Sequence, residues 1–130
     1  MKTIVQTKDA PEAIGPYSQA VIFEKYVYTS GQIPLTPAGV SVAEGDVKIQ
    51  TKQCLENLEA VLLAAGSSLD HILKTTCYLS NMEHFAEFNE VYAEYITSNP
   101  ARACVAVREL PRGVMVEIEA IAVRPSVEEL

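Results

Sequence analysis

The stretch Val116–Val123 restricts the fold more than any other segment, because it has the composition of a buried strand and yet carries two carboxylates. Side chains alternate between the two faces of a strand, so Glu117 and Glu119 share one face with two aliphatic side chains. The other face is wholly apolar. An unpaired carboxylate in apolar surroundings costs on the order of several kcal/mol, so each glutamate needs a cation, a donor or water. Arg102, which lies upstream, is a candidate cation.

The chain has the size of one domain. Its 130 residues, of which 48% are hydrophobic, can form one core but hardly two, so we expect a single domain over residues 1–130. The first residues lack the apolar run of a signal peptide. The longest apolar run, residues 60–65, is far shorter than the roughly 18 residues of a membrane span. We therefore expect a cytoplasmic protein with no membrane partner.

The charge and the cysteines argue against several classes of function. Ten basic and seventeen acidic residues give a net charge of −7, which repels phosphate backbones and predicts no nucleic-acid partner. Cys54, Cys77 and Cys104 are odd in number and widely spaced, so we expect neither a disulfide framework nor a metal site. No nucleotide-binding glycine loop or serine–histidine–aspartate pattern is evident, so these enzyme classes are not indicated.

Hydrophobic periodicity and turn residues predict eight regular elements. Asp46 has the character of a helix N-cap, and Ser80 and Glu83 form the pattern of a capping box before a second helix. We expect the last two strands to form a pair joined by a turn at residues 110–113. The predicted strands cover residues 2–6, 18–23, 26–30, 72–79, 103–107 and 115–123. The first predicted helix covers residues 47–65, and the second follows the Ser80 capping pattern and ends at about residue 98.

The order of these elements, β-β-β-α-β-α-β-β, predicts an α+β fold in which two helices pack on one face of a mixed sheet. Residues 31–45, with two prolines and three glycines, are expected to form a long surface loop. Two helices can cover only one side of the sheet. Because the strands are apolar on both sides, we expect the uncovered face to contact another subunit.

Arg102 and Glu117 are the leading candidates for a functional site. The guanidinium of Arg102 could bind a substrate carboxylate, or Arg102 could be a surface arginine or the structural partner of a glutamate. Glu117 could act as a general base in a partly dry pocket, or it could be a glutamate on an edge strand that faces solvent. Asn89 falls at the edge of the apolar stripe of the second helix, where its amide needs a partner.

Cys104 is the only thiol near these candidates in the sequence. A cysteine nucleophile requires a base, usually a histidine, and the only histidines, His71 and His84, lie far from Cys104 in sequence. A small core residue is therefore the simpler interpretation. The turns at residues 15–17 and 29–34 can present backbone N–H groups to a ligand, although turn chemistry alone explains both equally well.

Five segments in register closely resemble the RidA/YjgF family of imine deaminases across essentially the whole chain. They are residues 13–19 (AIGPYSQ), 29–34 (TSGQIP), 89–92 (NEVY), 100–105 (PARACV) and 116–122 (VEIEAIA). The resemblance implies a chorismate-mutase-like fold and a homotrimer with ligand clefts between its subunits. It also implies hydrolysis of 2-iminobutanoate and 2-iminopropanoate, the products of pyridoxal-phosphate-dependent dehydratases, to 2-oxo acids and ammonia without a cofactor.

The same resemblance implies which residues form the site. The residues implied in catalysis are Arg102, Glu117 and Cys104, and those implied in substrate binding are Tyr17, Ser30, Gly31 and Asn89. In this assignment Arg102 binds the substrate carboxylate, while Glu117 and the main-chain carbonyl of Cys104 aim water at the C=N carbon. Glu119 has no implied role and is interpreted as structural. Two other functions compete: a non-catalytic binder of 2-oxo acids or other small carboxylates, and a ribonuclease or translation inhibitor, which the acidic charge disfavours.

Overall fold

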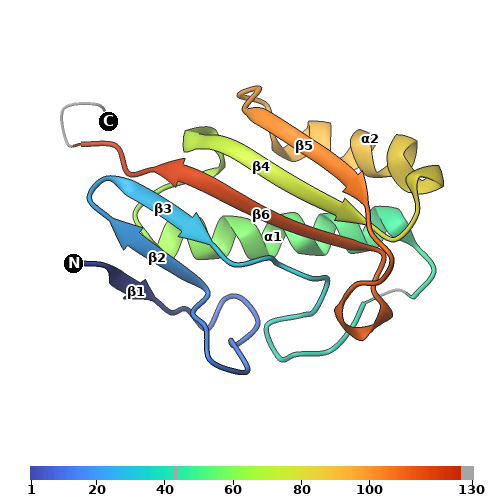
Figure 1. The fold of residues 1–130 in the computed structure, drawn as a ribbon, viewed down its shortest axis with the longest axis horizontal. Helices are drawn as coiled ribbons and strands as arrows, with labels where there is room; N and C mark the ends of the chain where they lie inside the picture. The colour runs from blue at the N-terminus through green and yellow to red at the C-terminus, as the bar shows by residue number, and fades with distance from the viewer. Residues whose placement is uncertain (43, 127–130) are drawn as a thin grey trace.

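A six-stranded sheet organises the computed structural model, which describes residues 1–42 and 44–126 (Figure 1). The order of strands in the sheet is β1-β2-β3-β6-β4-β5. The strands are β1 (Thr3–Val5), β2 (Ala20–Phe23), β3 (Tyr26–Thr29), β4 (Ile72–Leu79), β5 (Ala101–Ala106) and β6 (Val116–Val123). The helices are α1 (Val47–Ala64) and α2 (Phe85–Tyr95), with 3-10 turns at Leu69–His71, Met82–His84 and Pro111–Gly113. The predicted α+β class and order of elements are confirmed.

The predicted pairing of the last two strands is wrong. β5 pairs only with β4, in parallel, whereas β6 pairs antiparallel with β3 on one side and with β4 on the other. The connection through α2 brings the chain back in the direction of β4, and β6 then enters the middle of the sheet instead of extending its edge. Both edges of β6 are therefore paired within the sheet.

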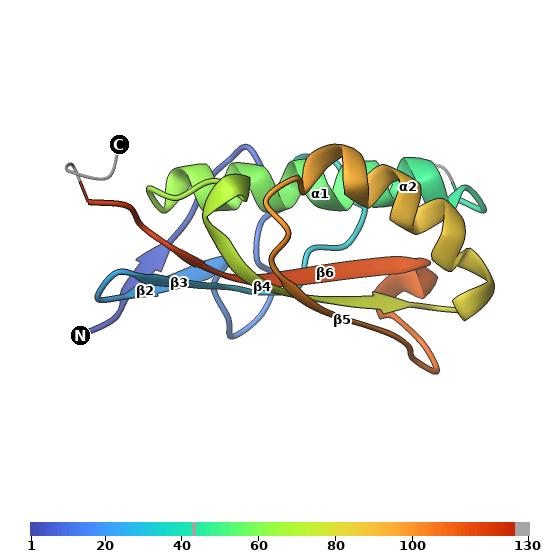
Figure 2. The ribbon, with the colours of Figure 1, turned by 90° about the horizontal axis from the view of Figure 1, so that it is seen from above.

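Both helices lie on the same face of the sheet, as expected (Figure 2). On β6 the side chains that point toward them are buried, whereas the alternate ones, Glu117 among them, are only partly buried. Within the described residues, no helix covers the opposite face. It presents apolar side chains to solvent, including Tyr28 at 45% exposure and Val105 at 45%. Such a face in a single chain fits the expectation of self-association.

The first helix begins and ends as predicted. The side chain of Asp46 accepts a hydrogen bond from the Ile49 N–H at 3.1 Å, which satisfies a free donor of the first turn. Gly66 follows the helix with φ +83°, a conformation that glycine adopts without strain. The N–H of Ser67 then donates to the Leu62 carbonyl at 2.8 Å, which completes a Schellman-type ending.

The second helix differs from the prediction at both ends. The capping side chain is that of Asn81, which accepts from the Glu83 N–H at 2.8 Å, so the predicted capping box with Ser80 is wrong. A 3-10 turn intervenes before α2 begins at Phe85. The helix ends at Tyr95 rather than near Ser98, because Ile96 takes an extended backbone that buries its side chain at 5% exposure. Within the described residues, no helix is long and apolar enough to span a membrane.

Candidate active site

Arg102 lies on the edge strand β5 and points toward α2. Its Nη1 donates to Asn89 Oδ1 at 2.7 Å, so the amide at the edge of the helix stripe has the partner that it was expected to need. The guanidinium carbon lies 4.8 Å from the ring centroid of Tyr92 and 5.5 Å from that of Phe85, within the range of cation–π contacts. These contacts hold an exposed arginine in a defined place.

Arg102 does not neutralise either glutamate of its own chain. In the parallel register Arg102 lies beside Thr75, a buried residue of the helix-covered face, whereas Glu117 lies beside Tyr78 on the open face. β4 separates β5 from β6, and the strand registers displace Arg102 from Glu117 by three residues along the strands, so their backbones are roughly 14 Å apart and their side chains point in opposite directions. The structural ion pair considered from the sequence is therefore absent within the described residues.

Glu117 is a half-buried carboxylate beside Gly31. A Cβ atom placed on Gly31 would lie 2.0 Å from Glu117 Oε2, so only glycine allows this approach of the backbone to the carboxylate. Burial raises the pKa of Glu117 above its ordinary value, and the charge of Glu119 raises it further. Among the residues that the structure describes, no hydrogen bond or ion pair reaches this carboxylate, which leaves it available to a substrate or water.

The loop that contains Gly31 is fastened to β6 by its backbone. The N–H of Gln32 donates to the Ile118 carbonyl at 2.8 Å, and the Ile118 N–H returns a bond to the Gln32 carbonyl at 3.1 Å. These bonds fix Gly31 directly against Glu117. A hollow of about 290 Å³ on the open face lies beside them, and the residues that line it are Gly31, Glu117, Glu119, Tyr78, Val107, Glu109, Leu110 and Pro111. Since β6 is central, the alternative interpretation of Glu117 as an edge-strand glutamate is wrong.

Glu119 has a partner that the sequence did not suggest. The Tyr78 hydroxyl donates to Glu119 Oε1 at 2.5 Å across the β4–β6 pair. This hydrogen bond is the main cause that raises the pKa of Tyr78 to about 12. The phenol therefore satisfies the second carboxylate of β6, as the structural interpretation of Glu119 requires. Tyr78 and Glu119 become partners only through strand pairing, so neither residue signals the other in the sequence.

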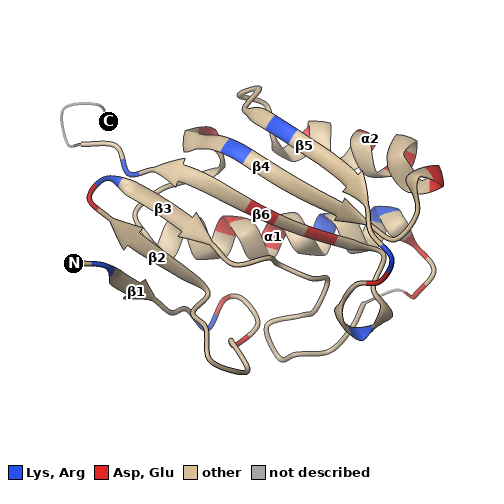
Figure 3. Cartoon of the chain, viewed as in Figure 1, with Lys and Arg blue, Asp and Glu red and all other residues tan. Residues whose placement is uncertain are grey.

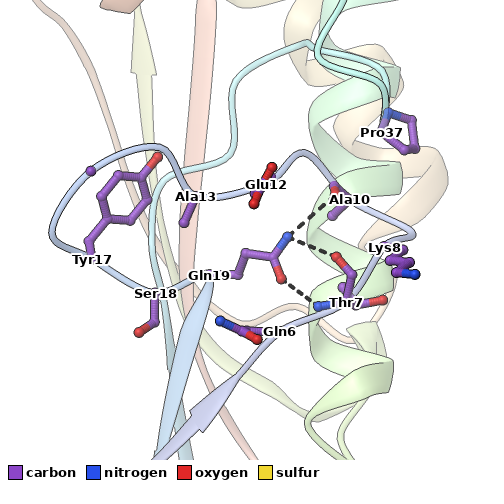
Figure 4. Close-up of a pocket in the computed structure, with 11 residues that line it drawn as sticks. Gln6, Thr7, Lys8, Ala10, Glu12, Ala13, Tyr17, Ser18, Gln19 and Pro37 are labelled. Atoms are coloured by element: carbon purple, nitrogen blue, oxygen red, sulfur yellow. Dashed lines mark hydrogen bonds between the residues drawn. The ribbon is translucent and has the colours of Figure 1, made fainter.

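Tyr17 belongs to the loop between β1 and β2, whose base is held by Gln19 (Figure 4), and Ser30 contacts this loop from the end of β3. The buried Gln19 amide accepts from the Thr7 N–H at 2.7 Å and donates to the Pro11 carbonyl at 2.7 Å, and the loop encloses a hollow of about 680 Å³. Ser30 Oγ donates to the Ser18 carbonyl at 2.6 Å, which joins this loop to the Gly31 corner. Tyr17 extends from the loop at 54% exposure. Gln19 is a positioning residue that the sequence interpretation missed.

The thiols have the character of packing groups. Burial raises the pKa of Cys104, and the nearby charge of Arg102 offsets this only in part, so the thiolate is disfavoured. Cys54 and Cys77 are fully buried in the core, as expected. The described part of the chain contains no group of three or more histidine, cysteine, aspartate or glutamate residues placed to hold a metal. Cys104 lies two residues from Arg102 on the same face of β5. The group for which the sequence resemblance implies a role is its main-chain carbonyl, not its thiol.

The structure thus divides the seven predicted site residues into two groups on opposite faces. One group, at the edge of the helix-covered face, comprises Arg102, Asn89 and Cys104. In the other, Glu117 and Gly31 line one hollow while Ser30 and Tyr17 line a second, and the adjacent positions of Ser30 and Gly31 in the chain join the two. The charged positions are also separated across the sheet, with acidic residues along the central strand β6 and a basic one on the outermost strand β5 (Figure 3). Within one chain these are two half-sites.

A family model described as Endoribonuclease L-PSP matches residues 7–124, which is nearly the whole chain. The chain belongs to the RidA/YjgF family. The match covers both half-sites and every strand except β1, so the resemblance carried by the five sequence segments is confirmed.

Individual relatives extend the similarity over almost the full length. RutC family protein PH0854 of Pyrococcus horikoshii is 50% identical over 123 residues, which are 94% of this chain and 98% of the relative. A 2-iminobutanoate/2-iminopropanoate deaminase of Salmonella typhimurium is 46% identical over 128 residues, 95% of this chain and 99% of the relative. The crystal structure of E. coli TdcF with bound serine matches with a TM-score of 0.88 at 44% identity, over 95% of this chain and 99% of that one.

Proposed function

We propose that the protein hydrolyses 2-imino acids, such as 2-iminobutanoate and 2-iminopropanoate, to 2-oxo acids and ammonia. The observation that carries the proposal is the Glu117 carboxylate, which is half-buried, free of partners among the described residues, and approached by the backbone of Gly31. Its raised pKa suits a general base. The Salmonella relative named for this activity supports the substrate class.

The proposed chemistry consumes one water and involves no oxidation or reduction. The imine reacts in its protonated iminium form, C=NH2+. Glu117 accepts a proton from water as the oxygen bonds to the C=N carbon, and the π electrons move to nitrogen to give a neutral carbinolamine. The protonated Glu117 then returns this proton to the amino group, the C–N bond breaks and ammonia leaves, and the hydroxyl proton passes to solvent water as the C=O group forms. No cofactor is required for these steps, and general base catalysis with positioning supplies an acceleration of about 10²–10⁴-fold.

Arg102 is proposed to bind the carboxylate that every 2-imino acid carries. Its planar fork matches a carboxylate, and the bond to Asn89 occupies Nη1 on one side only. Asn89, Ser30, Tyr17 and the backbones of Gly31 and Cys104 would complete the walls of the site. Because Arg102 and Glu117 point to opposite faces in one chain, we propose that each active site combines Arg102 of one subunit with Glu117 of the next.

A ring of three subunits meets this requirement. Heterologous contacts that close into a ring place the same two unlike surfaces at every interface. The uncovered sheet face, with its exposed apolar side chains, supplies surface for such contacts. The proposed assembly is therefore the homotrimer that the sequence resemblance implies, with three clefts between subunits. Cleavage of RNA, which the family description names, gains no support from the net charge of −7.

The proposal is tested by supplying the short-lived imine enzymatically. A threonine dehydratase and threonine generate 2-iminobutanoate in solution, and the release of ammonia and 2-oxobutanoate is followed with and without the protein. We expect release above the spontaneous rate, in proportion to protein concentration. A rate equal to the spontaneous one at every protein concentration would reject the proposed activity.

A further inference from the structure

The aromatic rings beside Arg102 point to a role that no catalytic assignment covers. We infer that Tyr92 and Phe85 are positioning residues, which orient the Arg102 guanidinium for the substrate carboxylate and so set substrate affinity. The rings lie 4.8 Å and 5.5 Å from the guanidinium carbon. This inference rests on the proposed function, since it takes Arg102 as the carboxylate-binding group.

An arginine on an exposed edge strand needs such support. Arg102 is exposed, and its long side chain loses much conformational freedom if it is fixed only when a ligand arrives. The bond to Asn89 fixes one end of the guanidinium, but a single hydrogen bond permits rotation about it. Contact with two rings restricts the plane as well. A guanidinium fixed in both respects is oriented before the substrate binds, which favours affinity.

The position of the nearer ring is itself set by the core. Tyr92 is buried at 7% exposure, packs 5.5 Å from the ring of Phe88, and its hydroxyl forms a 2.8 Å hydrogen bond with Thr75 Oγ1. Thr75 is fully buried and lies directly beside Arg102 in the register of β4 and β5. The strand that carries Arg102 and the ring that supports it are thus tied to the same core residue. This arrangement links the exposed guanidinium to a rigid part of the fold.

The inference predicts an effect on KM that is separate from kcat. Loss of one ring, in Tyr92→Leu or Phe85→Leu, is expected to raise both KM for the imine and Kd for 2-oxobutanoate by about 5- to 30-fold, with kcat within about twofold. Tyr92→Phe keeps the ring and should restore most of the affinity. The matched control is Tyr95→Leu, on the same helix but with its hydroxyl near Glu56 instead of near Arg102. This control should leave both constants unchanged.

A near-isosteric series protects the test against misfolding. Starting from Tyr92→Phe, progressive fluorination of the ring weakens its attraction for a cation while preserving its shape, so log KM should rise stepwise with fluorine number. Unchanged KM and Kd in the ring variants, while Arg102→Ala weakens binding by about 10- to 150-fold, would overturn this inference and leave the proposed function intact. The inference would also be overturned if the ring variants lowered kcat in proportion to the fraction of folded protein while KM stayed constant. If Arg102→Ala binds 2-oxobutanoate normally, the proposed function itself fails.

Discussion

Arg102 and Glu117 are held in opposite ways. Arg102 is exposed but contacts an amide and two aromatic rings, whereas Glu117 is half-buried and has no bonded partner among the described residues. A group that binds substrate gains from being oriented in advance. A group that must accept a proton gains from a raised pKa and from a carboxylate oxygen that accepts no hydrogen bond from the protein. The contrast supports the proposed division, in which the helix-covered half-site binds substrate and the open half-site carries out the chemistry.

The largest expected effect comes from removing the base. Glu117→Gln keeps the shape of the side chain but cannot accept a proton, so kcat should fall by about 10²–10⁴-fold. Binding of 2-oxobutanoate, measured by calorimetry, should change little. Glu94→Gln, an exposed glutamate of α2, is the matched control. Full activity in Glu117→Gln would mean that the open half-site has no catalytic role. If the protein only binds 2-oxo acids, the variant should bind as well as the native protein, and neither should show turnover.

Arg102→Ala tests the other half-site. Loss of a charge-assisted hydrogen-bonded pair should weaken 2-oxobutanoate binding and lower kcat/KM by about 10- to 150-fold. The effect should be mainly on KM, in contrast to Glu117→Gln. Arg124→Ala, which removes an arginine just beyond the far end of β6, serves as the control. Equal losses of kcat in Arg102→Ala and Glu117→Gln would contradict the proposal that one residue binds substrate and the other acts as the base.

Gly31→Ala asks whether the approach of the backbone to Glu117 matters. The added Cβ would meet the carboxylate at 2.0 Å, so Glu117 must move and kcat should fall by about tenfold or more. Gly39→Ala is the comparison, because its Cβ meets open space although its φ of +86° is strained. That control should lose stability without losing kcat. Retained activity in Gly31→Ala would show that the position of Glu117 is not set by this contact.

The smallest expected effect concerns Tyr78, whose hydroxyl forms a hydrogen bond with Glu119 in the open half-site. Tyr78→Phe removes the hydrogen bond to Glu119 and should lower the free energy of unfolding by about 0.5 kcal/mol, a value reduced for solvent exposure. The folded-state pKa is raised from 10.0 to about 12, so this stabilisation is complete below pH 10 and disappears as the pH rises through about 12. Urea unfolding of both proteins across this range measures it, with Tyr28→Phe as control. A difference that grows with pH would contradict the assignment.

Local signals in the sequence predicted much of the fold. The caps of α1 at Asp46 and Gly66 depend on neighbouring residues, and both predictions hold. The side-chain alternation of β6 is equally local and places Glu117 on the face predicted for it. The order of strands is not local. Nothing in residues 103–123 reveals that β4 separates the last two strands, so the predicted pairing was wrong.

The candidate site was predictable residue by residue but not in its arrangement. The alternation of β5 and β6 gives each side chain a face only after the strands are placed, so the sequence alone could not show that Arg102 and Glu117 lie apart. The partnership of Tyr78 and Glu119 could not be predicted for the same reason, because the two residues lie 41 positions apart in the sequence. The aromatic support of Arg102 was interpreted only as a core stripe of α2.

The central claim is that each active site needs two subunits, and a mixing experiment tests it directly. Arg102→Ala and Glu117→Gln proteins, each with a low kcat/KM, are unfolded together, refolded at a one-to-one ratio and assayed for imine hydrolysis at a substrate concentration far below KM, where both parent proteins are nearly inactive. In a randomly mixed ring, about one interface in four combines an intact Arg102 with an intact Glu117, so the account predicts recovery of about a quarter of native activity. Activity no greater than the mean of the two parent proteins, in mixed oligomers verified by mass, would contradict it.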